Sequence, residues 1–484
     1  MRTTQGGKRY APSLPACSPG ACAVKQNCRT GAEIGSTYAG TRTFGDNRGV
    51  AHEIKQDDGA EPGALFPAST DVLVVGAGPA GSAAAAWAAR NGLDVVLADK
   101  ARFPRDKACG DGLTPRAIAE LRHLGLADWL RGRPANWGLR AAGFGQELYL
   151  PWPGGSLPAH GSAVPRTELD ATIRDVALAS GATALQDAQA VDVERDGDRI
   201  SAVVFRRGDQ TISVRCRRLV VADGARSQLG RVLGREWHRD TAYGVAVRGY
   251  VASERSDDPW ISSHLELRGG AGELLSGYGW VFPLGRGEVN IGVGTLATSR
   301  RPADVALRPL LTLYTDQRRE DWRLSGPVRE PWSALLPMGG AVSGVAGRNW
   351  ALVGDAAGCV NPLNGEGIDY GLETGRLLAE LMMGTEDLQG AWPAVLRASY
   401  GEAFSIARRL AGLITVPGLL PAAGPVGMRS RTLMTLALRL MGNLILPEDA
   451  DVVARLWRGA GRISSLLDPR PPFSAGQRTW RTAG

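Results

Sequence analysis

Apolar residues recur at every second position or in short runs in some segments, which predicts strands. In other segments they recur every three or four residues, which predicts helices. Residues 71–100, DVLVVGAGPAGSAAAAWAARNGLDVVLADK, predict a strand, a glycine turn, an alanine-rich helix and a second strand. The other predicted elements are helices at 115–124, 166–181 and 365–384, an antiparallel meander at 190–227, an antiparallel sheet within 240–335, and a strand and turn at 349–358. Beyond residue 385 the helical spacing dominates.

Composition and charge exclude some classes of function. The 484 residues are 44% hydrophobic and 22% charged, which is ordinary for a globular protein. The net charge of +7 comes from 56 basic residues, of which only five are lysines, and the arginines are scattered, so we predict no nucleic-acid binding. The six cysteines show neither zinc spacing nor a disulfide framework, so we expect no metal and a reducing, cytoplasmic compartment.

The glycine turn after the first strand has the pattern Gly76-x-Gly78-x-x-Gly81. Gly76 permits the tight turn, Gly78 lets a pyrophosphate approach the backbone, and Gly81 allows close packing of the helix. The helix N-terminus then presents free N–H groups and a partial positive charge to the phosphates. Asp99 ends the second strand, where a carboxylate can accept hydrogen bonds from ribose hydroxyls. This segment predicts a Rossmann-type dinucleotide site.

Two later motifs indicate which dinucleotide binds. Asp223 and Gly224 follow a buried strand in VVADGARS, and Asp355 follows another in ALVGDAAGCVNPLNGEGI. Taken alone, Asp355 could be only a helix cap. The three motifs in this order resemble the FAD-dependent hydroxylases and reductases with the p-hydroxybenzoate hydroxylase-type fold. The resemblance implies that Asp355 holds the ribityl chain of FAD and that the next helix points its N-terminus at the flavin.

Three segments narrow the resemblance to one family. FPRDKACGDGLTPRAI, YGWVFPLGRGEVNIGVG and GDAAGCVNPLNGEGI together resemble the geranylgeranyl reductase family, over roughly residues 71–385. The family usually has Glu where this chain has Asp99, which is shorter by one methylene. The positions that the resemblance and the motifs assign to FAD are Gly76, Gly78, Ala80, Gly81, Asp99, Cys109, Gly110, Gly112, Arg166, Asp223, Gly224, Asp355, Gly367 and Ile368.

Three aromatic residues occupy alternate positions of a predicted strand, so their rings lie on one face. Such a face is either ordinary core or the wall of an apolar cavity, and the residues alone leave both open. The resemblance implies the second, because the family uses this signature to line a tunnel for an isoprenoid chain. An isoprenoid has no polar handle, so its affinity comes from buried apolar area, at roughly 25 cal/mol per Å². The matching residues are Tyr278, Trp280, Phe282, Pro283, Gly292 and Gly294.

The resemblance implies that reduced FAD delivers hydride to one carbon of an isolated double bond while a proton reaches the other. Cys109 matches a cysteine that the family keeps close to the isoalloxazine ring. We hypothesise that Cys109 donates or relays the proton, and packing against the flavin is an equally good explanation of its position. The implied substrates are geranylgeranyl diphosphate, a geranylgeranylated pigment or lipid, or the side chain of a quinone such as menaquinone. NAD(P)H, ferredoxin and other carriers stay open as electron donors.

The expected fold class is α/β (α+β): a Rossmann-type FAD-binding domain with an inserted antiparallel β-sheet substrate domain and a helical C-terminal region. The expected segments are a disordered N-terminal extension (1–68), the first part of the FAD-binding domain (69–239), the substrate domain (240–338), the Gly-Asp segment and helix of the FAD-binding domain (339–385), and the helical region (386–484).

The C-terminal region has two apolar stretches. Residues 410–428 carry no charge, but prolines at 417, 421 and 425 interrupt a regular helix, so we predict no membrane span. The later stretch, DVVARLWRGAGRISSLL, fits either a basic helix on an anionic membrane surface or a helix packed on the protein's own core. Its expected apolar face is Val453, Leu456, Trp457, Ala460 and Ile463, with Arg455, Arg458 and Arg462 displaced from it. A lipid substrate favours the membrane, so we expect a cytoplasmic protein held peripherally at the inner face.

Two other functions compete with an isoprenoid-chain reductase. An aromatic hydroxylase or halogenase of the same flavoprotein group shares the flavin motifs, and only the Tyr-Trp-Phe-Pro segment argues against it. A non-catalytic flavoprotein that binds lipid is the third alternative, and an intact cofactor site disfavours it. Turnover without O₂ separates a reductase from a hydroxylase.

Overall fold

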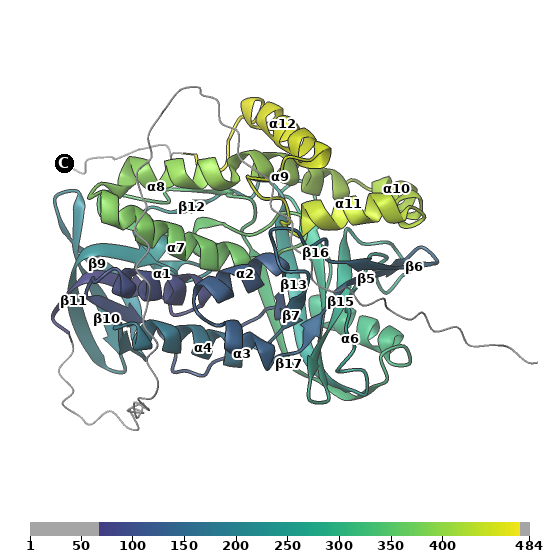
Figure 1. Cartoon of the computed structure of the whole chain (residues 1–484), viewed down its shortest axis with the longest axis horizontal. Helices are drawn as coiled ribbons and strands as arrows, with labels where there is room; N and C mark the ends of the chain where they lie inside the picture. The colour runs from purple at the N-terminus through teal and green to yellow at the C-terminus, as the bar shows by residue number, and fades with distance from the viewer. Residues whose placement is uncertain (1–66, 475–484) are drawn as a thin grey trace, which may run out of the picture. The chain divides into compact units, whose positions relative to one another are not determined.

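The computed structural model describes residues 67–474. The disordered extension expected at 1–68 falls almost entirely outside this range. Two seven-stranded sheets form the framework of the described chain, and helices of the C-terminal region run along the upper side of both in Figure 1. The fold class is α/β (α+β), with a parallel sheet of the FAD-binding type and a second sheet that is mainly antiparallel.

The first sheet is parallel at its centre. Its order is β8-β2-β1-β11-β10-β9, β19 also pairs with β11, and β9 and β10 extend it in antiparallel fashion. The central strands read as continuous apolar runs because residues on both of their faces are buried. The strands are β1 (Ser69–Val75), β2 (Val95–Ala98), β8 (Thr183–Leu185), β9 (Gln189–Asp196), β10 (Arg199–Arg207), β11 (Gln210–Val221) and β19 (Trp350–Leu352).

Two long helices, α1 (Pro79–Arg90) and α7 (Ile368–Gly384), pack on each other beside this sheet. Their approach is close because small residues meet: a Cβ added to Gly375 would lie 2.5 Å from the carbonyl oxygen of Ala80. The N-termini of both helices therefore face the same cavity. Other helices of this half are α2 (Pro115–His123), α3 (Ala127–Arg131), α4 (Arg166–Ala179) and α5 (Gln228–Val232).

The second sheet has the order β17-β13-β16-β15-β14-β5-β6 and is antiparallel except where β14 pairs with β5. Residues 138–151 supply β5 and β6, although the sequence pattern assigned them to the FAD-binding segment 69–239 and the sheet to 240–338. Nothing local announces a pairing between strands more than a hundred residues apart. The strands are β5 (Gly138–Gly143), β6 (Gln146–Pro151), β13 (Tyr243–Ser253), β14 (Ile261–His264), β15 (Gly277–Gly285), β16 (Glu288–Ala297) and β17 (Leu324–Leu336).

One helix and two small sheets complete this half of the chain. Helix α6 (Leu307–Arg318) packs on the second sheet, and its buried residues share a core with β13, β15 and β16. The short strands are β3 (Gly112–Leu113), β4 (Ala135–Asn136), β7 (Gly161–Ala163), β12 (Glu236–Trp237) and β18 (Val342–Ser343).

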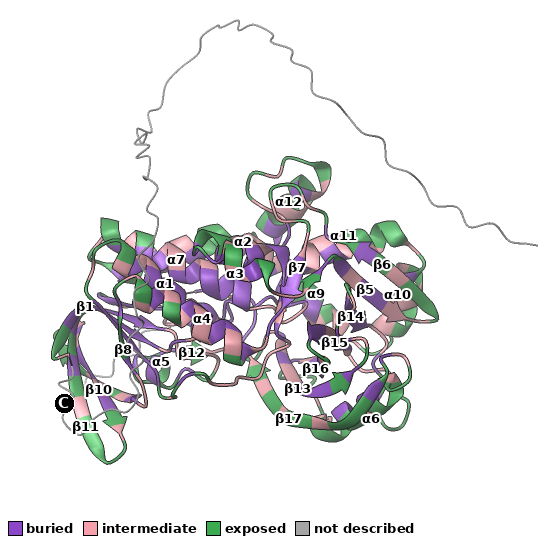
Figure 2. Cartoon of the chain, turned by 60° about the horizontal axis from the view of Figure 1, so that its bottom comes forward, coloured by how far each residue is buried: buried purple, intermediate pink, exposed green. Residues whose placement is uncertain are grey.

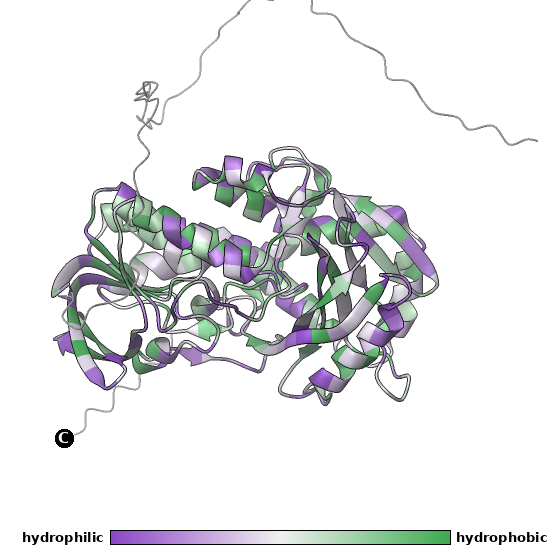
Figure 3. Ribbon diagram, turned by 90° about the horizontal axis from the view of Figure 1, so that it is seen from below, coloured by the Kyte–Doolittle hydropathy of each residue, from purple (hydrophilic) through white to green (hydrophobic). Residues whose placement is uncertain are grey.

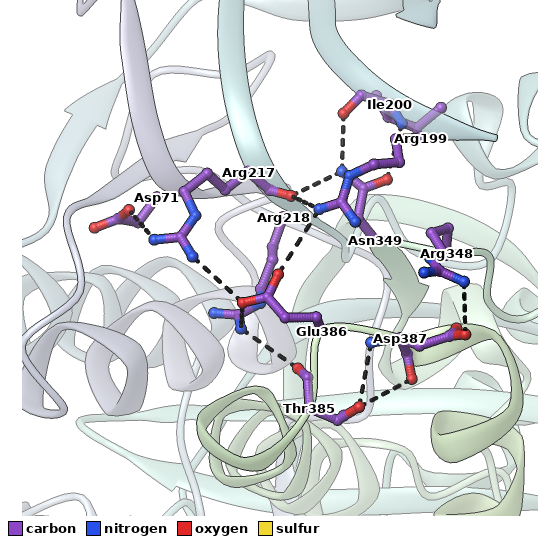
Figure 4. A network of polar contacts seen from close by, with 10 residues as sticks. All are labelled: Asp71, Arg199, Ile200, Arg217, Arg218, Arg348, Asn349, Thr385, Glu386 and Asp387. Atoms are coloured by element: carbon purple, nitrogen blue, oxygen red, sulfur yellow. Dashed lines mark hydrogen bonds and ion pairs between the residues drawn. The ribbon is translucent and has the colours of Figure 1, made fainter. Parts of the chain in front are cut away.

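A polar network far from the cavity joins the first sheet to the segment after α7 (Figure 4). Asn349 accepts a hydrogen bond from the N–H of Ile200 at 2.8 Å and donates to the carbonyls of Ile200 at 2.8 Å and Arg217 at 2.7 Å. Arg218 donates to Glu386 at 2.9 Å. The network satisfies backbone groups that would otherwise be buried without partners.

The C-terminal region is helical. Hydrophobic and hydrophilic residues alternate closely along the helices visible in Figure 3. Pro417 lies in the break between α9 (Glu402–Ile414) and α10 (Leu419–Met428), whereas Pro425 lies inside α10. Within residues 67–474 no single helix is long and apolar enough to cross a membrane. The bent helix pair Leu388–Ile414 and Leu419–Met428 has sufficient length and apolar composition when the two are taken together. The segments are α8 (Leu388–Leu396), a π-helical turn (Arg397–Gly401), α9 (Glu402–Ile414), α10 (Leu419–Met428), α11 (Arg431–Met441) and α12 (Val452–Leu466).

Helix α12 packs on α9 in a way the sequence pattern did not anticipate. The side it buries consists of Ala454, Gly461 and Ser464, because only small residues allow the two helices to approach this closely. Of the expected apolar face, Leu456 and Ile463 are exposed. The helix is thus attached to the protein, and Val453 and Trp457 are half-buried, yet Leu456 and Ile463 stay exposed.

Candidate active site

A cavity of about 510 Å³ lies where the two sheets, α1, α7, α10 and α11 come together. The glycine turn before α1 and the N-terminus of α7 border it, and so do the aromatic residues of β15. Side chains of α10 and α11 complete its apolar lining. The cavity therefore has a polar backbone border on one side and hydrocarbon on the other.

The glycine turn has the geometry that close approach of a phosphate requires. Gly76 has φ +105°, and a Cβ there would lie 2.3 Å from the carbonyl oxygen of Ala222. A Cβ at Gly81 would lie 1.8 Å from the carbonyl oxygen of Gly76, so both positions demand glycine. Gly78 borders the cavity with free space around it, the nearest side-chain atom being a guanidinium nitrogen of Arg105 at 3.5 Å.

Two helix N-termini border the cavity, and the N-cap residue of each is a glycine. The N-cap residues are Gly78 for α1 and Gly367 for α7, and both are in the cavity wall together with Ala80 and Ile368. At α1 no side-chain cap bonds the first N–H groups, whereas at α7 the Tyr370 N–H donates to Asp369 at 2.7 Å and Glu366 accepts from the N–H groups of Ile368 and Asp369. Both N-termini carry a partial positive charge, which favours phosphate or a negatively charged ring edge. The residues present therefore fit FAD.

Two of the predicted carboxylates serve the loops rather than the cavity wall. Asp99 accepts hydrogen bonds from the N–H groups of Ala77 at 2.7 Å and Ala101 at 2.9 Å, so it fixes the glycine turn. Asp223 accepts from the N–H of Leu229 at 2.9 Å and caps α5. Neither lines the cavity, whereas Gly224 next to Asp223 does.

The charged residues in the cavity wall are already paired. Asp355 forms an ion pair with Lys107 at 3.1 Å, and both line the cavity. Arg166 lines it as well and binds Asp170 at 2.7 Å, and Asp170 also receives Arg105 at 2.7 Å. Pairing fixes these side chains in place at the rim where a cofactor with charged phosphates would lie.

The three rings of β15 line the cavity side by side. Ring centroids are 5.9 Å apart for Tyr278 and Trp280, and 6.3 Å apart for Trp280 and Phe282. A Cβ at Gly292 would lie 2.1 Å from the Trp280 ring, so Gly292 makes room for the ring without lining the cavity. Gly294 borders the cavity and Pro283 does not.

The third ring packs against the loop that follows β2. A Cβ added to Gly110 would lie 3.2 Å from the Phe282 ring, and one added to Gly112 would lie 2.9 Å from it. Both glycines line the cavity, as does Cys109 beside them. The sequence assigned Gly110 and Gly112 to FAD, and the structure places them against the aromatic wall as well.

Asn290 on β16 links that loop to the rings. Its side chain accepts a hydrogen bond from Trp280 Nε1 at 2.9 Å and donates to the Cys109 carbonyl at 2.9 Å and to Asp111 Oδ2 at 2.8 Å. Tyr250 donates a further bond to Asp111 at 2.8 Å. Burial raises the pKa of Asp111 to about 7, although Arg248 and these hydrogen bonds oppose the rise.

The thiol of Cys109 faces the cavity in its protonated form. Burial raises its pKa, an effect that the nearby charge of Arg166 partly opposes. The sulfur accepts a hydrogen bond from the N–H of Asp111 at 3.4 Å. The thiol hydrogen is thus retained beside the aromatic wall.

Glu366 is a cavity residue to which the sequence motifs gave no role. It lies in the loop before α7, and its Oε1 has no hydrogen-bond partner in the described part of the chain. Burial raises its pKa well above the ordinary value, and the charge of Asp369 raises it further. A loop glutamate normally indicates a solvated side chain, so only the assembled fold reveals that this carboxyl group is buried and that its pKa is raised.

The family model described as an FAD binding domain matches residues 69–264. A curated relative called menaquinone reductase, from Mycolicibacterium smegmatis, is 64% identical over 407 residues, which cover 84% of this chain and 99% of the relative. A digeranylgeranylglycerophospholipid reductase from Methanopyrus kandleri is 33% identical over 316 residues, or 64% of this chain and 80% of the relative.

The chain belongs to the geranylgeranyl reductase family, in its menaquinone reductase-like branch. It is an FAD-dependent oxidoreductase. The resemblance inferred from the three sequence segments is confirmed.

Solved structures add that this family shares its fold with other flavoproteins. A geranylgeranyl bacteriochlorophyll reductase-like protein from Thermoplasma acidophilum has a TM-score of 0.61 at 20% identity, covering 82% of this chain and 96% of the other. The flavin-dependent brominase Bmp2 has a TM-score of 0.63 at 20% identity, covering 83% and 100%. At this identity the likeness shows the fold alone, so it gives no support to the halogenase alternative over a reductase of the geranylgeranyl reductase family.

Proposed function

We propose that the protein reduces a double bond in the polyprenyl side chain of menaquinone. The observation that carries the proposal is the cavity itself, which joins two helix N-termini with glycine N-caps, a protonated thiol and a wall of three aromatic rings. Support also comes from the relative called menaquinone reductase, which matches over 99% of its length.

The wall suits a hydrocarbon chain better than a small polar molecule. Beyond the rings, the cavity continues between apolar residues that include Met428 on α10 and Leu438 on α11. A polyprenyl chain gains roughly 25 cal/mol for each Å² of apolar surface that it buries there. Aromatic rings supply this area with few rotamers to immobilise.

The residues would hold FAD along the polar border. Gly78 and the N-terminus of α1 would receive the pyrophosphate, while Asp355 and the N-terminus of α7 would border the ribityl chain and the flavin. When bound and reduced, FAD supplies the hydride that adds to one carbon of the double bond. Tyr278, Trp280 and Phe282 would press the alkene into place and exclude water, which an unactivated double bond requires.

The second alkene carbon takes a proton, and Cys109 is the donor in this proposal. Its Sγ holds a proton in the cavity wall, as its raised pKa indicates. Tyr278 is a poorer donor because its O–H already donates to the Asn364 carbonyl at 2.5 Å. Glu366 is the alternative source, because burial raises the pKa of its carboxyl group and the residue lines the same cavity.

Mass spectrometry of the quinone fraction tests the substrate assignment. In a strain that lacks the gene, menaquinone should lose the mass of one or more H₂ units relative to the parent, and the intact gene should restore it. A variant with Gly81→Ala, which cannot form the glycine turn, is the matched negative control for complementation. Unchanged menaquinone together with a shift in another isoprenoid lipid would contradict the assignment and name the other substrate.

A further inference from the structure

Exposed large apolar side chains are concentrated in the C-terminal helices. Among residues 67–474, ten of the sixteen side chains of this kind lie on or directly after α9 to α12. These helices run together along one side of the described chain, and α10 and α12 both show exposed positions (Figures 1 and 2). We call this set the C-terminal apolar surface: Leu410, Leu413, Leu419, Val426, Leu433, Val452, Leu456, Ile463, Leu466 and Leu467. Exposed apolar sets of this size mark interaction sites.

Helix α12 contributes a regular stripe to this surface. Val452, Leu456, Ile463 and Leu467 follow one another at helical spacing, and each is more than 60% exposed. The helix is held on α9 by small residues instead, as described above, so folding does not need the stripe. Its apolar side is free for a partner.

Helices α10 and α11 are apolar on both sides. Their inner residues, among them Met428 and Leu438, line the cavity, whereas Val426 and Leu433 are exposed on the outside. A layer only one helix thick therefore separates the cavity from the C-terminal apolar surface.

That layer is weakly attached to the protein. Met428 is the one residue that α10 buries completely, and Leu438 is the one that α11 buries. Pro425 inside α10 has no N–H to donate. Segments with so few buried contacts open locally at low free-energy cost, and such segments serve as lids.

We propose that the C-terminal apolar surface docks on an anionic lipid bilayer and that the α10–α11 hairpin opens there to admit the substrate's polyprenyl chain. The identity of the passing chain rests on the proposed function, whereas docking itself does not. Charge favours an anionic bilayer over a second copy of the chain, since residues 402–474 contain nine arginines and only five acidic residues. Arg429, Arg431 and Arg455 are exposed and lie within three residues in sequence of Val426, Leu433 and Leu456, where they could contact anionic headgroups.

Co-sedimentation of the FAD-loaded protein with vesicles tests docking. The vesicles contain phosphatidylglycerol and phosphatidylcholine in equal parts, and pure phosphatidylcholine vesicles test the role of charge. Val426→Asp and Leu456→Asp should each weaken binding about tenfold, because each removes one buried apolar anchor. Met383→Asp changes a residue of similar exposure on α7, outside the surface, and should bind like the wild type. Thermal unfolding of all three should match the wild type, since the changed side chains are exposed.

Absence of wild-type sedimentation, or equal sedimentation of all variants, would overturn docking. A concentration-dependent dimer that Leu456→Asp dissociates, without any vesicle binding, would assign the surface to a second copy instead.

Two further measurements test the opening of the hairpin. Amide hydrogen exchange should be faster in α10 and α11 than in α7, and slower exchange there would contradict a lid. Val426→Asp should reduce turnover of menaquinone in vesicles about tenfold, because docking is weakened, but leave turnover of a soluble short-chain menaquinone unchanged. If the wild type turns over neither quinone while it still binds vesicles, the proposed function fails and docking stands.

Discussion

The link between the aromatic wall and the Cys109 loop can be cut at one residue. Asn290 is completely buried, and its side chain makes three hydrogen bonds, to Trp280, to the Cys109 carbonyl and to Asp111. Asn290→Ala removes all three. The indole N–H of Trp280 then has no partner, whereas the Cys109 carbonyl keeps its bond from Arg248 and Asp111 keeps its bond from Tyr250. We expect Trp280 and the loop to lose their fixed relative position.

The cost follows from the number of bonds. A buried hydrogen bond contributes about 1 kcal/mol net, and leaving the indole N–H unsatisfied raises the loss of that one bond to about 1–3 kcal/mol, so the three bonds together give about 4 kcal/mol. Asn349→Ala is the matched control, because Asn349 is also buried and makes three hydrogen bonds, but to the backbone of the first sheet. Both variants should therefore lose a similar free energy of unfolding.

The two variants should differ only at the active site. Urea unfolding measures the stability of each, and the visible spectrum of bound flavin and the turnover of menaquinone measure the site. Asn290→Ala should shift the flavin spectrum and lower turnover, while Asn349→Ala leaves both as in the wild type at temperatures where it is folded. An unshifted spectrum and normal turnover in Asn290→Ala would refute the view that Asn290 holds the wall against the loop.

Three further changes test separate parts of the site. Burial raises the pKa of Asp111 from 3.8 to about 7, so the folded protein keeps a proton that the unfolded chain loses, and the free energy of unfolding falls as pH rises through that window. Asp111→Asn should abolish roughly 4 kcal/mol of this decline. If urea unfolding of Asp111→Asn and of the wild type depended on pH in the same way, the raised pKa would be contradicted. Gly81→Ala should abolish retention of FAD, because its Cβ would lie 1.8 Å from the Gly76 oxygen, whereas Gly384→Ala, with nothing within 4 Å, should retain FAD fully. Cys109→Ser should slow single-turnover alkene reduction about a hundredfold at normal FAD content. An unchanged rate would show that Cys109 is not the proton donor, and Glu366→Gln would then test Glu366 in that role.

Features encoded by neighbouring residues could be predicted from the sequence. The strand, glycine turn and helix around Gly76 lie within thirty residues, and the shared face of Tyr278, Trp280 and Phe282 follows from the alternation of a strand. In both cases the residues predicted to contact the cofactor or substrate lie within the element that the local pattern predicts. The same stretch of sequence therefore predicts the element and the site residues on it.

Features that arise from distant pairings could not be predicted. Strands β5 and β6 join the second sheet through β14, which no local pattern announces. On α12 the pattern marks large apolar residues as the packing side, but close helix contact selects Ala454, Gly461 and Ser464. Glu366 acquires its raised pKa only when α7, β15 and the Cys109 loop enclose it.

Anaerobic single turnover of the reduced protein tests the central claim most directly. FAD in the purified protein is reduced photochemically under exclusion of O₂, mixed with menaquinone, and followed by its visible absorbance and by mass spectrometry of the quinone. The account predicts reoxidation of the flavin with gain of one H₂ unit in the polyprenyl chain. A flavin that stays reduced until O₂ is admitted, or a quinone whose polyprenyl chain is unchanged, would contradict it.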